Sequence, residues 1–539
     1  MNPFQSLAKS AVRAKDIPCV ICGNESISYE EMRERALTVG GSLLSSGLST
    51  GDRVAFVMGN SPRIIEILYG CFAAGLVAVP VNARLHAREV AYIVENSGAS
   101  VLIHDAGHVD GIAGEIDLFG GLTARYCTSP AEGASDYAEL LEPENGLEQP
   151  VDTDIEDPVW LFYTSGTTGR PKGATWTART VSAIVLNYLC DIYNIRQGSS
   201  VLHVAPMSHG SGIVALPAIA RGATNVILDT PSFNPEAMFE LIERHRIAHV
   251  AFVAPTQILM MNEAFERGRF DLSSLEAVCY GGAPIYVDQL RRAMDLFGPV
   301  FAQIYGQGEA PITITGMSAE THAELREADD PRIGSAGTVR TDVESHAVDA
   351  DGRPLTAGQA GEIVVRGDVV MKGYWNDPEA TEAAIPDGWL RTGDIGMFDQ
   401  SGYLFLLDRA KDMIVSGGNN VYPREVEEVL AKHPEIENAV VLGIPDDHWG
   451  EAVHAVIVAA GNTDLSASDV MDFCGSQLAG YKKPKSVEFV DELPTSGYGK
   501  VMRREMREKY WTGHDRKVGG GGVSTVESQE YRPSRKDGR

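Results

Sequence analysis

The sequence predicts a large α/β domain followed by a smaller α+β domain. Short buried strands alternate with amphipathic helices from about residue 30 to 310, which is typical of βαβ units and parallel sheets. Over 335–410 the pattern changes to short strands separated by turn signals such as DADG and DQSG, which indicates a small β-barrel-like subdomain. The chain has 539 residues, more than one hydrophobic core usually supports, so several domains are expected.

Taken in order, the elements begin with a helix over 30–48, a strand over 52–58 and a buried helix over 64–75. The most regular stretch is predicted to contain five buried strands: PVWLFY (158–163), SVLHVA (200–205), HVAFV (249–253), LEAVCY (275–280) and VFAQIY (300–305). Amphipathic helices are expected between them over 179–193, 235–246 and 286–298. Strands GEIVVRG (361–367) and GYLFLLD (402–408) belong to the β subdomain.

Residues 412–510 combine helices (424–433, 468–480) with strands (438–444, 452–460, 486–492), a compact α+β module. We therefore expect an N-terminal domain over 1–410, a C-terminal domain over 411–511 and a disordered polar tail over 512–539.

Composition excludes several classes of protein. Lys+Arg 46 against Asp+Glu 74 gives a net charge of −28, the wrong sign for a general nucleic-acid binder. The seven scattered cysteines suit reduced thiols, and the CVIC pair at 19–22 is not expected to bind metal, because positions i and i+3 of a strand face opposite sides. No apolar stretch is long enough for a signal peptide or a membrane span, which predicts a cytoplasmic protein.

Each of the five buried strands runs into a loop rich in Gly, Ser, Thr, Pro or His. Ligands of open α/β sheets bind at the carboxyl ends of the strands, so we expect one composite site at one sheet edge. The loop TSGTTGRPKG offers backbone N–H groups, hydroxyls and two cations, which suits phosphate oxygens. It is not a Walker A loop, because Pro171 stands where the second glycine should be.

The stretch YTSGTTGRPKG (163–173) resembles the phosphate loop of the adenylate-forming superfamily, which includes acyl- and aryl-CoA synthetases, peptide-synthetase adenylation domains and luciferases. Six further motifs resemble those of this superfamily in the same order: APMSHGSG (205–212), YGGAP (280–284), YGQGE (305–309), RTGD (391–394), LDRAKDMI (407–414) and TSGYGK (495–500).

The resemblance implies an ATP-dependent acid–CoA ligase whose small domain is mobile. A carboxylic acid and ATP would give an acyl-adenylate and pyrophosphate, and CoA would then give acyl-CoA and AMP. Lys500, Glu309 and His209 would be catalytic, with Glu309 binding Mg²⁺ and Lys411 acting as the hinge. The implied ATP- and AMP-binding residues are Thr164, Ser165, Gly166, Thr167, Thr168, Gly169, Lys172, Gly282, Ala283, Pro284, Tyr305, Gly306, Gln307, Gly308, Asp394, Arg409 and Lys500.

The other implied residues bind the acid and CoA. The acyl pocket would be formed by His209, Ser211, Gly212, Gly281, Gly306, Ala310, Pro311 and Ile312, a small and uncharged set that suits an aromatic, alicyclic or medium-chain acid. CoA would contact Arg84, Ser416, Gly417, Gly418, Trp449, Tyr481, Lys483 and Lys485. In the amino-acid adenylation domains of this superfamily, an Asp early in the loop that matches MSHGSG binds the ammonium group of the substrate. No acidic residue occurs between Leu202 and Leu228 here, so the resemblance disfavours an α-amino acid as substrate.

Several alternatives stay open. The adenylate could pass to an amine or a carrier protein instead of CoA, or the chain could be a non-catalytic nucleotide- or acyl-binding protein. Lys500 could be a solvated lysine, His209 a structural histidine, Glu309 a helix-start carboxylate, and the CoA set a solvated basic turn. A homodimer also stays open. The sequence departs from the superfamily at Gly308, where YGxTE has Thr, so we expect Gly308→Thr to leave activity intact or raise it, with a collapse indicating that Gly308 makes room for substrate.

Overall fold

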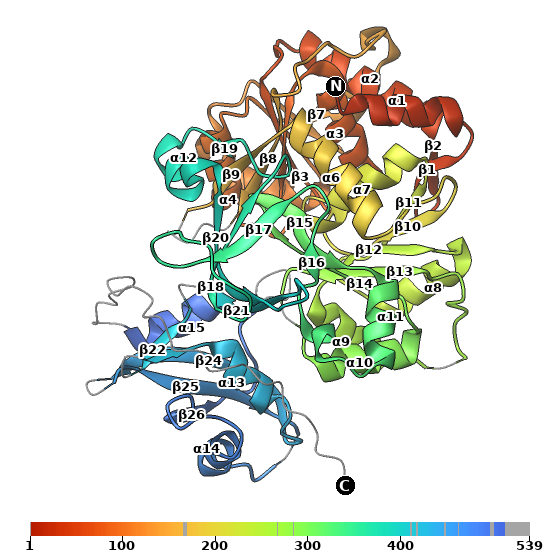
Figure 1. Cartoon of the computed structure of the whole chain (residues 1–539). Coiled ribbons are helices and arrows are strands. Elements are labelled where there is room, and N and C mark those ends of the chain that lie inside the picture. Colours follow the sequence, from red (N-terminus) through yellow and green to blue (C-terminus); the bar gives the residue numbers. More distant parts are fainter. Residues whose placement is uncertain are drawn as a thin grey trace.

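Figure 1 shows a large part of the chain above and a smaller part, coloured blue, below it. The computed structural model describes residues 2–164, 170–266, 268–283, 285–409, 412–416, 419–446, 449–461, 463–495 and 501–511. The expected domain boundary at 410/411 and the expected tail over 512–539 lie outside these residues, so both stay predictions.

One sheet of the large part combines N-terminal strands with the strands that flank the phosphate loop. Across the sheet the described strands are β19 (Gly373–Tyr374), β9 (Lys172–Thr177), β8 (Pro158–Thr164), β4 (Val77–Val81), β3 (Arg53–Val57), β5 (Val101–His104), β6 (Ala124–Cys127) and β7 (Ser135–Asp136). Strands β3, β4, β5 and β8 pair in parallel, whereas β9 is antiparallel to β8. The sheet is therefore mixed at the edge that carries the phosphate loop.

A second sheet contains the other four strands of the regular stretch. Its described strands, in order, are β16 (Thr338–Val339), β15 (Ala310–Met317), β14 (Phe301–Gln307), β13 (Ala277–Gly281), β12 (His249–Val253), β10 (Ser200–His203), β11 (Thr224–Ile227), β1 (Pro18–Cys22) and β2 (Glu25–Ser28). From β14 to β1 all pairings are parallel, and β15 returns antiparallel to β14. All five predicted buried strands are confirmed as strands.

The expectation that these five strands share one sheet edge is wrong. Strand β8 lies in the first sheet, and β10, β12, β13 and β14 lie in the second. The chain after β8 returns as strand β9, and the chain after β14 returns as strand β15, so neither loop leads into a helix. Periodicity identifies buried strands but carries no information about which sheet each strand joins.

The helices of the large part were predicted only in part. Those described are α1 (Phe4–Arg13), α2 (Tyr29–Ser45), α3 (Pro62–Ala74), α4 (Ala87–Ser97), α5 (Val109–Gly114), α6 (Ala178–Asp191), α7 (Gly210–Arg221), α8 (Pro235–His245), α9 (Pro255–Ala264), α10 (Val287–Phe297), α11 (Ala319–Glu327) and α12 (Pro378–Ala384). The helices α2, α3, α6, α8 and α10 occur where the apolar periodicity predicts them, and the other helices of the large part were not predicted. Helix α3 begins and ends at residues that favour helix termini. Ser61 is its N-cap, Pro62 lies in its first turn, and Gly75, at φ +66°, follows its last turn.

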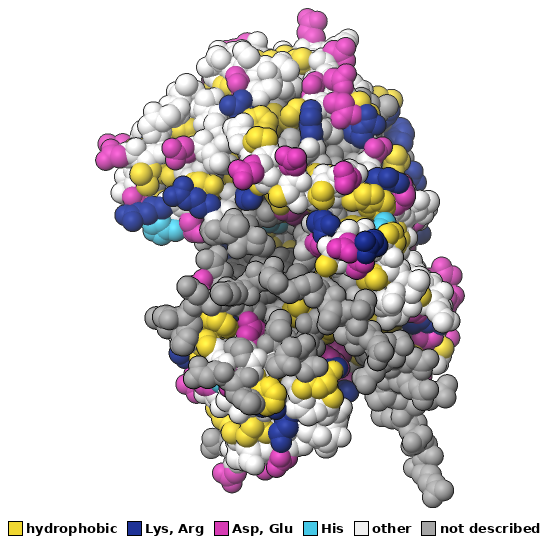
Figure 2. Space-filling view, turned by 60° about the vertical axis from the view of Figure 1, so that its left-hand side comes forward, with side chains coloured by type: hydrophobic (Ala, Val, Ile, Leu, Met, Phe, Trp, Pro, Cys, Tyr) yellow, Lys and Arg dark blue, Asp and Glu magenta, His cyan; other side chains and the backbone are white. Residues whose placement is uncertain are grey.

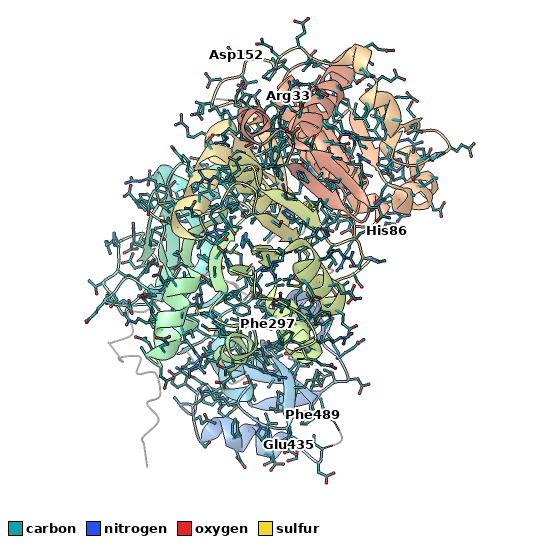
Figure 3. All side chains as sticks on the ribbon, turned by 90° about the vertical axis from the view of Figure 1, so that its right-hand side faces the viewer. Arg33, His86, Asp152, Phe297, Glu435 and Phe489 are labelled. Carbon is teal, nitrogen blue, oxygen red and sulfur yellow. The ribbon has the colours of Figure 1, made fainter. Side chains whose placement is uncertain are left out.

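One hydrophobic core joins the two sheets. It includes Trp176 on β9, Ile184 on α6, Val214 on α7 and Cys279 on β13, which places α6 and α7 between the sheets. Farther down, Phe297, labelled in Figure 3, packs its ring 4.8 Å from that of Phe265 in the core of the second sheet. The sheets are therefore held together by apolar packing rather than by shared strands.

The β subdomain is an antiparallel sheet of β17 (Glu344–Val348), β18 (Gly361–Arg366), β20 (Leu390–Phe398) and β21 (Leu404–Arg409). Within the described residues, its edge strands β17 and β21 do not pair with each other. An isolated bridge between Thr338 and Tyr403 links this sheet to strand β16 of the second sheet.

The small part is the predicted α+β module. Its described elements are β22 (Ile414–Ser416), β23 (Asn419–Val421), α13 (Pro423–Leu430), β24 (Ile436–Asp446), β25 (Gly450–Ala459), α14 (Ala467–Gly475), β26 (Ser486–Phe489) and α15 (Arg503–Trp511). Helix α15 was missed because RREMREKYW is mostly charged. Its Met506 and Tyr510 pack against Leu442 and Val456, a tertiary contact that overrides weak amphipathicity.

Figure 2 shows Lys/Arg and Asp/Glu interspersed over the visible face of the large part, so the acidic excess forms no single-sign surface there. In the part of the chain that the structure describes, no helix is both long and apolar enough to cross a membrane. All seven cysteines are free thiols, and Cys19 is fully buried on β1.

Candidate active site

A cavity at the carboxyl ends of β13 and β14 brings together predicted nucleotide-binding residues. It encloses about 200 Å³. The predicted residues that line it are Gly282, Ala283, Tyr305, Gly306 and Asp394. Residues that the sequence analysis missed also line it, among them Gln303 and Ser335 and, from the small part, Arg424 and Arg503. The cavity is therefore formed by both parts of the chain.

Tyr305 and Asp394 form a buried pair in this cavity. The Tyr305 hydroxyl donates a hydrogen bond to Asp394 Oδ2 at 2.6 Å. Asp394 follows Gly393, whose φ of +68° favours glycine, and its backbone N–H donates to Thr392 Oγ1 at 3.1 Å. The pair joins the second sheet to the β subdomain and fixes the direction of the carboxylate.

Glu309 lies in the turn between β14 and β15, so it is not a helix-start carboxylate. Its side chain is buried, and two groups donate to the same oxygen, Oε1: the Tyr374 hydroxyl at 2.7 Å and the Thr164 hydroxyl at 3.3 Å. Its backbone carbonyl accepts from the Met371 N–H at 2.8 Å. A carboxylate from the second sheet is thus anchored to the first sheet.

Tyr374 is a site residue that the sequence analysis missed. It lies on the two-residue strand β19, which pairs with β9, and its ring faces the Lys172 ammonium, 5.1 Å from the ring centroid. Burial and the nearby Glu309 carboxylate raise the pKa of the Tyr374 hydroxyl above its ordinary value, so it stays a proton donor. The stretch MKGYWNDP carries no local signal for this contact.

Gly308 allows the two sheets to approach closely. A Cβ atom at this position would lie 2.2 Å from Thr164 Cγ2 and 2.8 Å from the Phe162 ring. The Gly308 carbonyl accepts a hydrogen bond from Trp176 Nε1 at 2.8 Å. The missing side chain therefore does not widen a substrate pocket, because Thr164 and Phe162 fill that space.

His209 is the N-cap residue of α7 and lies beside the aromatic cluster at the start of the phosphate loop. Its ring meets the Phe162 ring edge-on at 4.9 Å, and its Nδ1 lies 3.0 Å from Ser208 Oγ. Burial lowers the pKa of His209 to about 4, so the imidazole is neutral near pH 7.

Two residues predicted for the acyl pocket are corrected. The Ser211 hydroxyl is buried against His203 Nδ1 at 2.9 Å, inside the core, and is therefore committed to a structural hydrogen bond. A Cβ on Gly212 would lie 1.8 Å from the Met207 carbonyl oxygen, so this glycine serves the tight start of α7. Their sequence position next to His209 did not reveal which way each residue faces.

The other acyl-pocket candidates surround the ends of β13, β14 and β15. Gly281 and Gly306 are needed for close backbone packing, since a Cβ on either would lie 2.4 Å from a neighbouring backbone atom. Ala310 and Pro311 begin β15, and Ile312 has φ +54°, an unusual conformation for a β-branched residue that tends to occur at functional sites.

Phe252 is a further residue that the sequence analysis missed. Its ring would lie within 3.4 Å of a Cβ added to Gly210 or Gly282, so it fills the space between the His209 loop and the YGGAP loop. Its strand HVAFV looks like an ordinary buried strand, and nothing in its pattern singles out this side chain.

The predicted CoA-binding residues are brought together only in part. Lys485 Nζ lies 5.6 Å from the centroid of the exposed Trp449 ring. Lys483 instead lies 3.3 Å from Asp472 on α14, and the Tyr481 ring faces Lys482. Ser416 is buried at the end of β22. Arg84 follows β4, and its backbone N–H donates to Asn82 Oδ1 at 3.0 Å.

Several predicted residues lie outside the described residues. They are Ser165, Gly166, Thr167, Thr168, Gly169, Pro284, Lys411, Gly417, Gly418 and Lys500, together with the side chain of Arg409. Their roles stay predictions.

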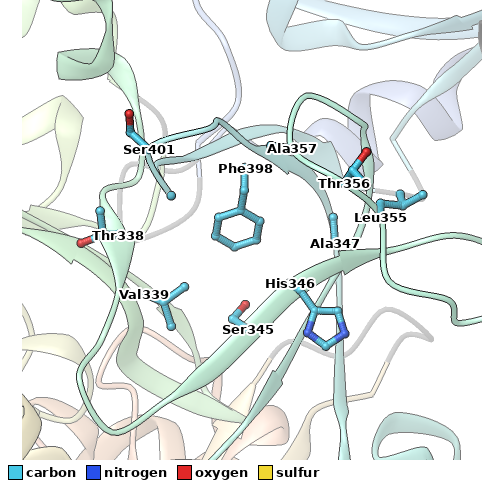
Figure 4. Close-up of a pocket in the computed structure, with 11 residues that line it drawn as sticks. Thr338, Val339, Ser345, His346, Ala347, Leu355, Thr356, Ala357, Phe398 and Ser401 are labelled. Carbon is cyan, nitrogen blue, oxygen red and sulfur yellow. The ribbon is translucent and has the colours of Figure 1, made fainter. Parts of the chain in front are cut away.

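A second cavity, of about 390 Å³, lies in the β subdomain and is drawn in Figure 4. Val339, Ser345 and Phe398 line it, and His346 is the only titratable residue among its lining residues. No predicted site residue contributes to this cavity, so we do not assign the chemistry to it.

Two family profiles match the chain. The profile described as AMP-binding enzyme matches residues 7–375, and the profile described as AMP-binding enzyme C-terminal domain matches residues 425–500. The chain belongs to the AMP-binding enzyme family. The resemblance seen in the motifs is thereby confirmed, as is the large α/β part with a smaller α+β part.

Relatives within the AMP-binding enzyme family match over nearly the whole chain. A protein named feruloyl-CoA synthase from an Amycolatopsis species is 38% identical over 491 residues, covering 90% of this chain and 95% of the relative. The Mycobacterium tuberculosis long-chain-fatty-acid–CoA ligase FadD13 is 35% identical over 490 residues, covering 90% and 93%. The solved structure of the amide bond synthetase McbA from Marinactinospora thermotolerans has a TM-score of 0.84 at 29% identity, covering 94% and 99%.

Proposed function

We propose that the protein is an ATP-dependent carboxylic acid–CoA ligase that accepts aromatic or fatty acids. One observation carries the proposal: Tyr305 on β14 binds Asp394, and Glu309, four positions later in the β14–β15 turn, binds Thr164; the two partners come from two other sheets. Three of the superfamily's motifs thus converge around one turn. The relatives named feruloyl-CoA synthase and long-chain-fatty-acid–CoA ligase support the acceptor and the two classes of acid.

The first step joins two anions. A carboxylate oxygen attacks the α-phosphorus of ATP, the bond to the bridging oxygen breaks, and pyrophosphate leaves with the electron pair. Positive charge must offset the repulsion between the reacting groups. Lys172 on β9 and Lys500 in the C-terminal motif would supply it, while the Asp394 carboxylate and Arg409 would bind the ribose hydroxyls.

Glu309 fits the role of a Mg²⁺ ligand. Both hydrogen bonds from the described residues fall on Oε1, so Oε2 is left to bind a cation. The described residues contain no cluster of three or more His, Cys, Asp or Glu that could hold a metal by itself. ATP phosphates would have to provide further oxygen ligands, as is usual for Mg²⁺. When bound, the cation would neutralise phosphate charge.

The acid would lie beside His209, Phe252 and Ile312. The neutral imidazole and the apolar side chains provide no charge for an ammonium group, and the flat Phe252 ring suits either an aromatic ring or an alkyl chain.

In the second step the CoA thiol attacks the acyl carbon and AMP leaves. Trp449 and Lys485 would contact the adenine and phosphates of CoA, since an aromatic ring beside an ammonium can both stack on a base and bind a phosphate. Arg84, Tyr481 and Lys483 would be further contacts. Ser416, Gly417 and Gly418 would line the thiol path after rotation about Lys411.

A different acceptor is the second candidate. The neighbour McbA is named an amide bond synthetase, and Lys483 is paired with Asp472 rather than with Trp449. An amine acceptor would need neither Trp449 nor Lys485.

The test is an acid panel with ATP and Mg²⁺, with and without CoA, in which AMP, pyrophosphate and acyl-CoA are followed by mass spectrometry. Acyl-CoA formed from aromatic or fatty acids is the expected result. Pyrophosphate without acyl-CoA would favour the amine or carrier acceptor, and no turnover with any acid would favour a binding protein.

The variant Lys500→Ala separates the two steps. We expect a loss of roughly 10²–10³-fold in acyl-AMP formation, by analogy with removal of one preorganised donor, and near-normal thioester formation from supplied acyl-AMP. Lys509→Ala is the matched control, because Lys509 lies on the same part of the chain and contacts Glu488 and the Tyr510 ring rather than any predicted site residue. Equal loss in both half-reactions would contradict the assignment.

A further inference from the structure

The loop that carries Glu309 is held by a segment far along the chain. Met371 N donates to the Glu309 carbonyl, and Lys372 N and Trp375 N donate to the Thr175 and Gly173 carbonyls, each at 2.8 Å. Residues 371–375 therefore bond on one side to the β14–β15 turn and on the other side to β9. This backbone strap joins the two large sheets.

Tyr374 is the side chain of this strap that reaches the site. Its hydroxyl donates to Glu309 Oε1 at 2.7 Å, and its ring faces the Lys172 ammonium at 5.1 Å. Lys172 Nζ also lies 3.8 Å from Asp377 Oδ2, just beyond the strap. One tyrosine thus contacts both the carboxylate and the cation that the proposed reaction needs.

The backbone around Tyr374 leaves it little freedom. Tyr374 pairs with Ala174 in the β19–β9 ladder, and its own N–H donates to Thr381 Oγ1 at 2.9 Å. Because the Tyr374 hydroxyl is already held in place, it can orient the Glu309 carboxylate with no further loss of conformational entropy when substrate binds.

We propose that Tyr374 is a positioning residue for adenylation, which rests on the function proposed above. It binds Oε1 of Glu309 so that Oε2 faces the cation of the bound nucleotide, and its ring places the Lys172 ammonium at the end of the phosphate loop. Partners of this kind typically change metal affinity or activity by roughly 10–100-fold when removed.

The variant Tyr374→Phe removes only the hydroxyl. We expect the Mg²⁺ concentration for half-maximal acid-dependent ATP–pyrophosphate exchange to rise by about 10–100-fold. Binding of Mn²⁺ in the presence of ATP, measured by electron paramagnetic resonance, should weaken in parallel. Thioester formation from supplied acyl-AMP should stay near the wild-type rate.

Tyr137→Phe is a matched control. The Tyr137 hydroxyl also donates to a buried glutamate, Glu66 Oε2, at 2.8 Å, but this pair lies against α2 and α3, in the N-terminal core. Both variants should lower the Tm by similar amounts, and only Tyr374→Phe should change the Mg²⁺ and Mn²⁺ titrations.

A double variant tests whether Tyr374 acts through Glu309. In the Glu309→Gln background, adding Tyr374→Phe should change the exchange rate little, because the carboxylate that Tyr374 orients is already absent. Fully additive losses, or unchanged cation titrations in Tyr374→Phe, would overturn the inference. If wild-type protein makes no acyl-AMP with any acid, the proposed function fails instead.

Discussion

Gly308 shows how one missing side chain can couple two loops. Its Cα faces Thr164 and Phe162, and Thr164 donates to Glu309, the residue next to Gly308. The expectation from the sequence that threonine is tolerated at position 308 is therefore reversed. A side chain there would push Thr164 away from Glu309.

We expect Gly308→Thr to lower the free energy of unfolding by about 1–3 kcal/mol, as overpacking does, and to slow ATP–pyrophosphate exchange. Adding Thr164→Ser removes Cγ2, the atom 2.2 Å from the new Cβ, and keeps the hydroxyl. The double variant should recover part of both losses in urea unfolding and in the exchange assay. Full activity in Gly308→Thr alone would show that Thr164 can rotate without cost.

At the scale of elements, helices α13 and α15 are joined through strand β24. Glu427 on α13 accepts from the Val441 N–H at 2.7 Å and from Arg503 Nη2 at 2.6 Å, and Arg503 Nη1 donates to the Val441 carbonyl at 3.3 Å. Arg503 opens α15, three positions after Lys500. The brace therefore fixes the chain segment that follows the predicted catalytic lysine.

Removing Arg503 would leave the buried Glu427 carboxylate without its cationic partner. We expect Arg503→Met to destabilise the small part by roughly 3 kcal/mol or more, because Glu427 is buried. Hydrogen exchange at the Val441 amide and urea unfolding measure this. Arg366→Met is the control, since its partner Glu344 is exposed and such pairs contribute about 1 kcal/mol or less. Equal effects of the two variants would contradict the brace.

At the scale of the molecule, buried histidines make stability depend on pH. Burial lowers the pKa of His203 and His322 to about 4 and that of His249 to about 3. In the unfolded chain each pKa returns to about 6.5, so unfolding takes up protons between pH 6.5 and 4. The contribution of these neutral histidines to the free energy of unfolding is therefore fully present above pH 6.5 and is lost as the pH falls towards 4.

We expect His322→Gln to reduce this proton uptake by nearly one proton near pH 5 and by much less at pH 7, so the slope near pH 5 changes by about 1 kcal/mol per pH unit. Glutamine can still accept from the Tyr280 hydroxyl, which lies 2.9 Å from His322 Nε2. Urea unfolding between pH 7 and 5 gives the slope for both proteins. Identical slopes would show that His322 titrates normally in the fold.

Much of the fold and some of the site could be predicted from local pattern. Strand β12 occupies 249–253 as expected, and α2, α3, α6, α8 and α10 match their predicted spans within a few residues. Each such element is encoded by the spacing of its own apolar residues and by its caps. The resemblance of YGQGE and RTGD to superfamily motifs pointed to Glu309 and Asp394, because each of these motifs is a short continuous stretch of sequence.

The sequence alone determined the family, many of the helices and strands, and the charged and polar groups that the proposed reaction would use. The tertiary structure decided which of these groups meet. Tyr374 reaches Glu309 across 65 positions, Thr164 reaches it across 145, and Ser211 turns into the core although it lies beside His209. Such contacts depend on how two separate sheets pack around a shared core, and no local periodicity encodes that arrangement.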